Sequence, residues 1–86
     1  MEIQANLLRL SNQWLIAQVS ELPTEDTLPG DPDCALNDPF VLDSEGNLSS
    51  WPEFSDDREI AVRSSDITTI VDPSKELLSR YIKALE

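Results

Sequence analysis

The stretch that decides the fold is Ile60-Ala61-Val62-Arg63-Ser64-Ser65-Asp66-Ile67-Thr68-Thr69-Ile70-Val71. Two runs of apolar and β-branched residues flank a polar turn at 63–66. Such runs, bounded by polar turn residues, are typical of β-strands. The stretch therefore predicts two short strands, 60–62 and 67–71, joined by a tight turn.

A helix is expected directly after this stretch. Asp72 is suited to the N-cap and Pro73 to the first helical position. The apolar residues that follow recur at the spacing of one helix face, at Leu77, Leu78, Tyr81, Ile82 and Leu85. A helix over 73–85 is too short to be stable alone. We therefore expect its apolar face, with Leu78 and Ile82 as packing residues, to lie on the sheet or on a neighbouring subunit.

Further strands are expected toward the N-terminus, so that all strands fall within residues 2–71. They are predicted at 3–10, at 14–20, at 40–42 with residues 35–38 leading into it across Pro39, and at 48–51. The apolar alternation in the first of them shifts phase between Leu7 and Leu8, which indicates a bulge or a bend. Pro39 interrupts the third strand, and proline is tolerated there at an edge or a bulge. Five or six short strands, tight turns and one C-terminal α-helix predict an all-β (mainly β) fold, a small and strongly bent barrel.

The negative charge is concentrated in the middle of the chain. Residues 21–59 hold twelve acidic residues and one basic residue, so their charge is 1 − 12 = −11, which equals the net charge of the whole chain. Three prolines in the acidic loop 21–34 exclude a helix or a central strand there. The acidic loops either keep the protein soluble or form a surface that attracts a basic partner and opposes nucleic acid.

Length and composition exclude several classes of protein. A chain of 86 residues predicts a single domain, 1–86. No apolar run approaches the ~20 residues of a membrane helix, and no basic region precedes an apolar stretch as in a signal peptide. The only cysteine, Cys34, allows no disulfide framework, which fits a reducing cytoplasm. A small core without disulfides favours stabilisation by self-association.

Catalysis, cofactors and metals are not expected. The chain has no histidine to act as a base or metal ligand, and no hydroxyl has an evident activating partner. Acidic neighbours raise the pKa of the Cys34 thiol and make the thiolate scarce. Asp43 and Glu45 alternate as in a calcium loop, but the later glutamate of an EF-hand is missing.

Several motifs together resemble one family. They are Trp51-Pro52-x-Phe54-Ser55-x-Asp57, Ile60-x-Val62 and Asp66-Ile67-x-Thr69-Ile70-Val71-x-Pro73. This pattern is similar to the small Sm-like (LSm/Hfq-type) proteins of cyanobacterial viruses and related marine metagenomic sequences. The resemblance implies a five-stranded barrel that forms a homo-oligomeric ring of about five to seven subunits by pairing edge strands. It also implies RNA association without catalysis, in the cytoplasm of an infected cyanobacterium.

The resemblance also suggests RNA-binding residues. In Sm proteins the turn before the last strand carries Arg-Gly and then an apolar residue, and Arg63 and Ile67 occupy the first and last of these positions. Ser64 replaces the glycine. An aspartate and an asparagine near the third strand complete the family's pocket, and Asn37 and Asp38 are the candidates here. Arg63 could instead form a surface ion pair with Asp66.

Trp51 and Phe54 also allow two interpretations. They could stack on bases, or fill the barrel mouth or the subunit interface, which is the commoner role of such aromatic pairs.

The sequence thus predicts a ring with an RNA-associated or RNA-chaperone role. The alternative is an acidic interaction or structural ring that docks a basic host or viral protein. The two are distinguished by whether loops 21–34 and 43–47 lie on the same face as Arg63.

Overall fold

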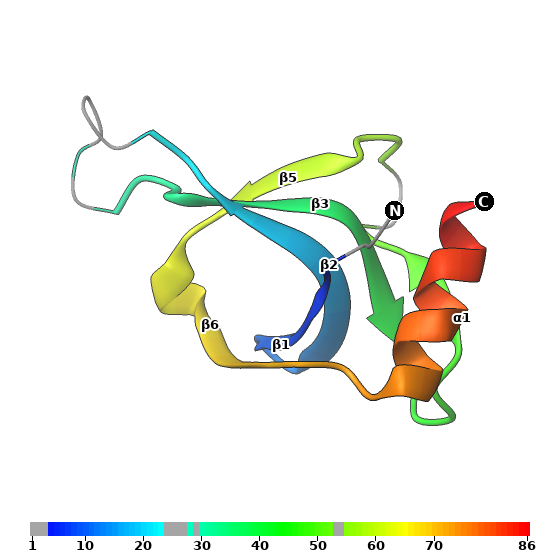
Figure 1. Cartoon of the computed structure of the whole chain (residues 1–86). Helices are drawn as coiled ribbons and strands as arrows, with labels where there is room; N and C mark the ends of the chain where they lie inside the picture. Colours follow the sequence, from blue (N-terminus) through cyan, green and yellow to red (C-terminus); the bar gives the residue numbers. More distant parts are fainter. Residues whose placement is uncertain (1–3, 24–27, 29, 53–54) are drawn as a thin grey trace.

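A computed structural model describes residues 4–23, 28, 30–52 and 55–86. These form six strands, one 3₁₀ turn and one α-helix (Figure 1). The elements are β1 (Asn6–Leu10), β2 (Gln13–Glu21), β3 (Cys34–Leu42), β4 (Leu48–Ser50), β5 (Glu59–Val62), η1 (Ser64–Asp66), β6 (Ile67–Val71) and α1 (Lys75–Leu85). The predicted strands and the tight turn at 63–66 are therefore present, and the fold is mainly antiparallel β with one C-terminal helix.

The sheet has five positions although it contains six strands. Its order is β4-β3-β2-β1-β6, and β5 pairs with β3 as well. Both short strands pair with β3. β4 pairs with the C-terminal part of β3, and β5 pairs with its N-terminal part. In Figure 1 the sheet curls so that β5 and β6, joined by η1, come round to the same side of the barrel.

The sheet bends where Pro39 interrupts the third strand. The sequence predicted a third strand interrupted by Pro39, and β3 runs for nine residues, Cys34–Leu42, through the proline. The β2–β3 register shifts between Ile16 and Gln18, opposite this point, and Asp38 has a positive φ of 50°. Proline cannot donate to the ladder, so the strand continues past it only with this irregularity. A second register shift lies between Arg9 and Leu10 in the β1–β6 pair, where Thr68 is the extra residue on β6. The irregularity expected between Leu7 and Leu8 is not found, because β1 pairs with β2 in regular register from Asn6 to Leu10.

Apolar residues pack on both faces of the sheet. Leu8, Leu15, Ala17 and Leu36 form the buried core inside the barrel. The outer face carries a second core, made of Ala5, Ile16, Phe40 and the helix residue Tyr81. Neighbouring residues in one strand can both be buried, as Leu15 and Ile16 are, because each contributes to a different core.

Tyr81 fixes α1 over the bend in the sheet. Its side chain is fully buried and its ring meets the Phe40 ring edge-on, with centroids 5.8 Å apart. The hydroxyl donates to the carbonyl oxygens of Asp38 (2.9 Å) and Asn37 (3.3 Å). These carbonyls lie where β3 departs from regular pairing, so Tyr81 satisfies backbone groups that the irregular ladder leaves free.

The helix begins later than the sequence predicted. Ser74, and not Asp72, is the N-cap, and its hydroxyl accepts a hydrogen bond from the Leu77 amide at 3.1 Å. The first helical residue is Lys75 in place of Pro73. Serine is as effective a cap as aspartate, and Ser74 stands three residues before the amide that it caps. The prediction of the start was therefore wrong by two residues.

Candidate functional site

The Arg63 turn holds its arginine in an ion pair. The Arg63 guanidinium donates to both carboxylate oxygens of Asp66, from Nε at 2.9 Å and from Nη2 at 3.2 Å. Half of the Arg63 side chain is exposed. The alternative in which Arg63 pairs with Asp66 is therefore present in the structure. A bidentate pair of this kind already uses the two donors that would otherwise face a phosphate or a base.

Asp33 is the residue that sequence reasoning missed at this turn. Its carboxylate accepts hydrogen bonds from the Ser64 amide at 2.6 Å and from the Ser64 hydroxyl at 2.7 Å. These two bonds, the hydroxyl first, lower the pKa of Asp33 below its ordinary value of 3.8. In the sequence Asp33 is marked only as an aspartate just before a strand. Its partner, Ser64, lies 31 residues further along the chain. Pairing of Cys34 with Val62 brings the two segments together.

Asn37 and Asp38 lie at the other end of β5 from Arg63. Asn37 is paired with Glu59, four residues before Arg63, which corresponds to about 13 Å along a strand. The Asn37 amide donates to the Gln18 carbonyl and the Ser20 hydroxyl. The Asp38 carboxylate pairs with Arg58 at 3.2 Å. The three predicted RNA contacts are therefore not brought together, and each already has partners within the chain.

The four packing candidates have different surroundings. Trp51 packs against the core inside the barrel and donates its indole N–H to Gln13 at 3.2 Å. Leu78 packs against the outer core with Leu77 and Leu85. Ile82 is half-buried but is not part of that core. Phe54 lies outside the described residues.

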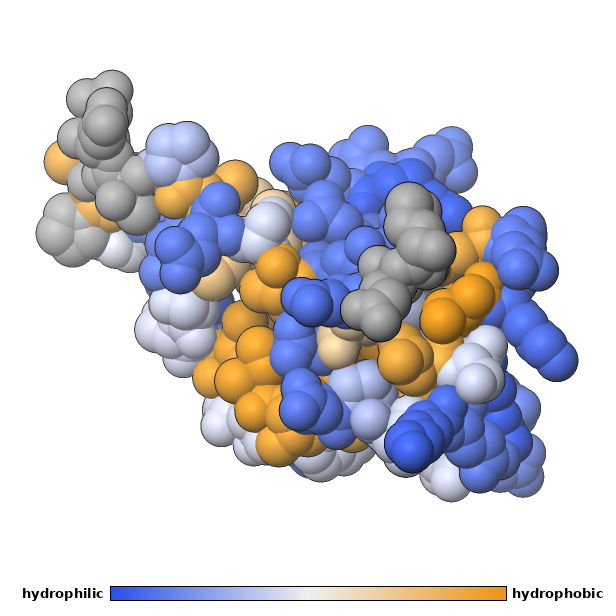
Figure 2. Space-filling model, in the orientation of Figure 1, coloured by the Kyte–Doolittle hydropathy of each residue, from blue (hydrophilic) through white to orange (hydrophobic). Residues whose placement is uncertain are grey.

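A pocket of about 500 Å³ opens at the barrel mouth beside Arg63. It is lined by Leu10, Ser11, Gly30, Pro32, Ala61, Val62, Arg63 and Asp66. Figure 2 shows an apolar area within the curl of the sheet, between η1 and β1. The end of the acidic loop 21–34 therefore lies beside Arg63, which meets one half of the criterion that distinguishes the RNA and docking interpretations.

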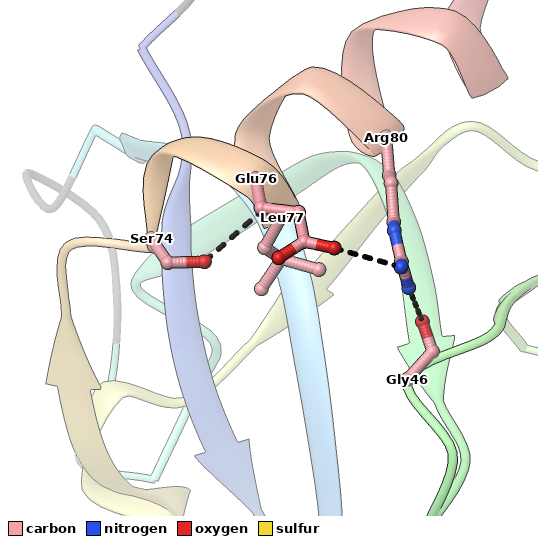
Figure 3. Close-up of a pocket in the computed structure, with 5 residues that line it drawn as sticks. All are labelled: Gly46, Ser74, Glu76, Leu77 and Arg80. Atoms are coloured by element: carbon pink, nitrogen blue, oxygen red, sulfur yellow. Dashed lines mark hydrogen bonds and ion pairs between the residues drawn. The ribbon is translucent and has the colours of Figure 1, made fainter.

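The turn at 43–47 lies elsewhere, against the start of α1 (Figure 3). The Arg80 guanidinium contacts the Gly46 carbonyl at 3.5 Å and the Glu76 carboxylate at 2.9 Å. Gly46 has a φ of +84°, and a Cβ there would lie 3.4 Å from Arg80 Nη1. The small pocket between them, of about 200 Å³, is thus the seam where Arg80 joins the helix to the turn.

The family of the chain can now be given. A family model described as "Family of unknown function (DUF6561)" matches residues 1–86. The chain belongs to this family. No curated protein gives a significant match to it.

In this DUF6561 member, the acidic side chains of the turns have structural partners. The Asp43 carboxylate accepts from the amides of Asn47 and Glu45 and from the Asn47 side chain. The Asn47 amide, as the largest contribution, lowers the pKa of Asp43. Within the described residues, no group of three or more metal-binding side chains is close enough to hold an ion. The oxygens of Asp43 close the turn instead.

Cys34 is a poor nucleophile in this setting. Burial raises the pKa of its thiol, and the neighbouring Asp33 carboxylate raises it further. The direction agrees with the expectation from the sequence, although burial contributes more than charge. Among the described helices, none is long and apolar enough to cross a membrane. The candidate functional site of this DUF6561 chain is the pocket lined by Arg63 and Asp66, with Asp33 bonded to the adjoining Ser64.

Proposed function

We propose that the protein is a non-catalytic, self-associating Sm-like subunit that docks a basic protein segment through its acidic surface. The observation that carries the choice of partner is the pair of carboxylates at the Arg63 turn. Asp66 neutralises the arginine, and Asp33 holds the backbone beside it. A positively charged partner gains from such a surface, whereas a phosphate backbone is opposed by it.

Self-association is supported by the free edge of β6. Among the residues that the structure describes, this strand pairs only with β1. Ile70 and Val71, which face opposite sides of the sheet, are 51% and 45% exposed. An edge strand with unpaired backbone groups and apolar side chains is a template for another chain. Head-to-tail pairing of β6 with the β4/β5 edge of the next copy closes into a ring when the rotation allows it, which the family resemblance puts at about five to seven subunits.

RNA association is the second candidate. It is favoured by the half-exposed Arg63 at the rim of a pocket large enough for a small planar group. For RNA to bind there, the guanidinium must leave Asp66. Binding at this pocket would therefore require a local rearrangement and would weaken steeply with salt.

Self-association is tested by light scattering during size-exclusion chromatography. The wild-type chain is expected to elute with the mass of a ring. Ile70→Lys places a charge on the β6 edge and should yield monomers with an unchanged far-UV spectrum. Leu28→Lys is the matched control, since Leu28 is 72% exposed but lies in the loop. A wild-type monomer at micromolar concentration would overturn the self-association proposal.

The partner is tested on the same column and then by titration. Protein from gently lysed cells should show no excess absorbance at 260 nm that ribonuclease removes. A lysine- and arginine-rich peptide should bind in a salt-dependent way. Short uridine-rich and adenine-rich RNAs should not bind at moderate salt. RNA binding that is lost in Arg63→Ala would reverse the order of the two candidates.

A further inference from the structure

The pocket at the barrel mouth combines an apolar lining with an acidic surround. Its apolar part consists of Leu10, Pro32, Ala61 and Val62. Ala61 is exposed, and Leu10 and Val62 are only half-buried although they border the inner core. The pocket thus leaves apolar surface open to solvent. A buried apolar anchor surrounded by a polar rim is the usual architecture of a protein-binding hot spot.

The rim around this lining carries more negative than positive charge. Arg63 and Asp66 line the pocket, as does Pro32, whose neighbours along the chain are Asp31 and Asp33. Asp33 and Asp66 are fixed by their bonds to Ser64 and Arg63, so their charges stay in place. Three carboxylates and one guanidinium leave a local charge of −2, by the count 1 − 3. The rim therefore favours cationic groups on either side of whatever fills the pocket.

We infer that this pocket receives one apolar side chain of a partner segment whose neighbouring residues are lysine or arginine. The inference rests on the proposed docking function and specifies which side chain of the partner binds in the pocket. The size of about 500 Å³ admits a leucine or an aromatic ring together with part of its backbone.

The test compares two fluorescent peptides that differ at one position. Both carry several lysines and arginines, and the central residue is leucine in one and serine in the other. The leucine peptide is expected to bind about tenfold or more tightly, which is the effect of burying one such side chain. Binding is measured by fluorescence anisotropy at low and moderate salt.

Variants of the pocket separate the anchor from the charge. Ala61→Leu fills the pocket from an exposed position and should remove the preference for the leucine peptide. Ala84→Leu is the matched control, because Ala84 is an exposed alanine on α1. Asp31→Asn should weaken both peptides by a few fold, whereas Asp72→Asn, which removes a carboxylate beside α1, should leave both unchanged. Melting curves establish that each variant is folded.

The outcomes are distinguishable. Equal binding of the two peptides, or a preference that Ala61→Leu leaves intact, would overturn the anchor pocket while the acidic docking function stands. Binding of neither peptide, even at low salt, would overturn both proposals. A leucine preference that Ala61→Leu abolishes and Ala84→Leu preserves would support the pocket as the site.

Discussion

The two ends of the barrel are built in contrasting ways. At the α1 end, Tyr81 is fully buried, and apolar residues from four elements enclose it. At the η1 end, Arg63, Ser64 and Asp66 are all exposed, and ion pairs and hydrogen bonds hold them. Burial supplies most of the stability of a small domain, and exposed polar contacts supply little. The α1 end therefore contributes more to the stability of the fold than the η1 end does.

The largest effect is expected at Tyr81. Tyr81→Ala removes a buried ring and two hydrogen bonds at the bend, and should lower the free energy of unfolding by about 3–5 kcal/mol. Urea denaturation followed by circular dichroism measures it. Ser65→Ala, in the exposed η1 turn, is the control and should change stability by less than about 0.5 kcal/mol. Equal losses at both sites would contradict the division between the two ends.

The helix face gives the next largest effect. Leu78→Ser should cost about 2 kcal/mol, because Leu78 packs against the outer core. Ile82→Ser should cost about 1 kcal/mol, since Ile82 is half-buried and is not part of that core. Thermal melting of the two variants side by side measures the difference. A larger loss for Ile82→Ser would point to burial of that residue against a neighbouring copy.

A smaller effect isolates the polar contact of Tyr81. Tyr81→Phe keeps the ring on Phe40 and removes only the hydroxyl. The carbonyls of Asn37 and Asp38 then lose a donor, which should cost about 1 kcal/mol. Hydrogen exchange at the β2–β3 bend, compared with exchange in β1, would locate the loss. An unchanged exchange rate at the bend would mean that water replaces the hydroxyl.

The α1 end was also the more predictable of the two from sequence. The spacing of Leu77, Leu78 and Tyr81 encodes one apolar face directly, so the helix and its packing followed from local periodicity. The residue at which the helix begins did not follow from periodicity. Asp72 and Ser74 are both good N-caps, and only the path of the chain selects between them. The strands at 60–62 and 67–71 could likewise be predicted from local sequence. Their pairing partners could not, since register depends on contacts distant in sequence.

The η1 end was harder because its contacts join distant segments. Asp33 and Ser64 meet only after β3 and β5 have paired, and nothing near Asp33 in the sequence marks it as a partner of the turn. Asn37 and Asp38 were chosen by position along the chain, yet Pro39 changes the path there. Asp38 adopts a positive φ and turns to Arg58. The polar residues at 63–66 located the turn, whereas the position of Asn37 and Asp38 relative to it depends on the path of β3.

Low pH should reduce the stability of the η1 end by protonating the Asp33 carboxylate. Because the pKa of Asp33 is lowered in the folded protein, its stabilising effect is fully present above the ordinary value of 3.8 and is lost as the pH falls through the folded pKa. The melting temperatures of wild type and Asp33→Asn should differ at pH 7 and converge below about pH 4. Asp31→Asn removes the same charge nearby without touching Ser64 and should show no such convergence. A constant gap between wild type and Asp33→Asn would mean that the carboxylate does not bind Ser64.

The smallest effect on stability is expected at Arg63. Arg63→Ala breaks an ion pair in which both side chains are about half exposed, and such pairs contribute about 0–1 kcal/mol. The variant also leaves Asp66 without its counter-charge and makes the pocket rim more negative. Affinity for a basic peptide should therefore rise by a few fold at low salt and less at high salt, while the melting temperature scarcely changes. Anisotropy titrations at two salt concentrations measure this, with Arg80→Ala at the α1 end as the control. A fall in peptide affinity would mean that Arg63 contacts the partner itself, and the acidic rim would no longer explain binding at this end of the barrel.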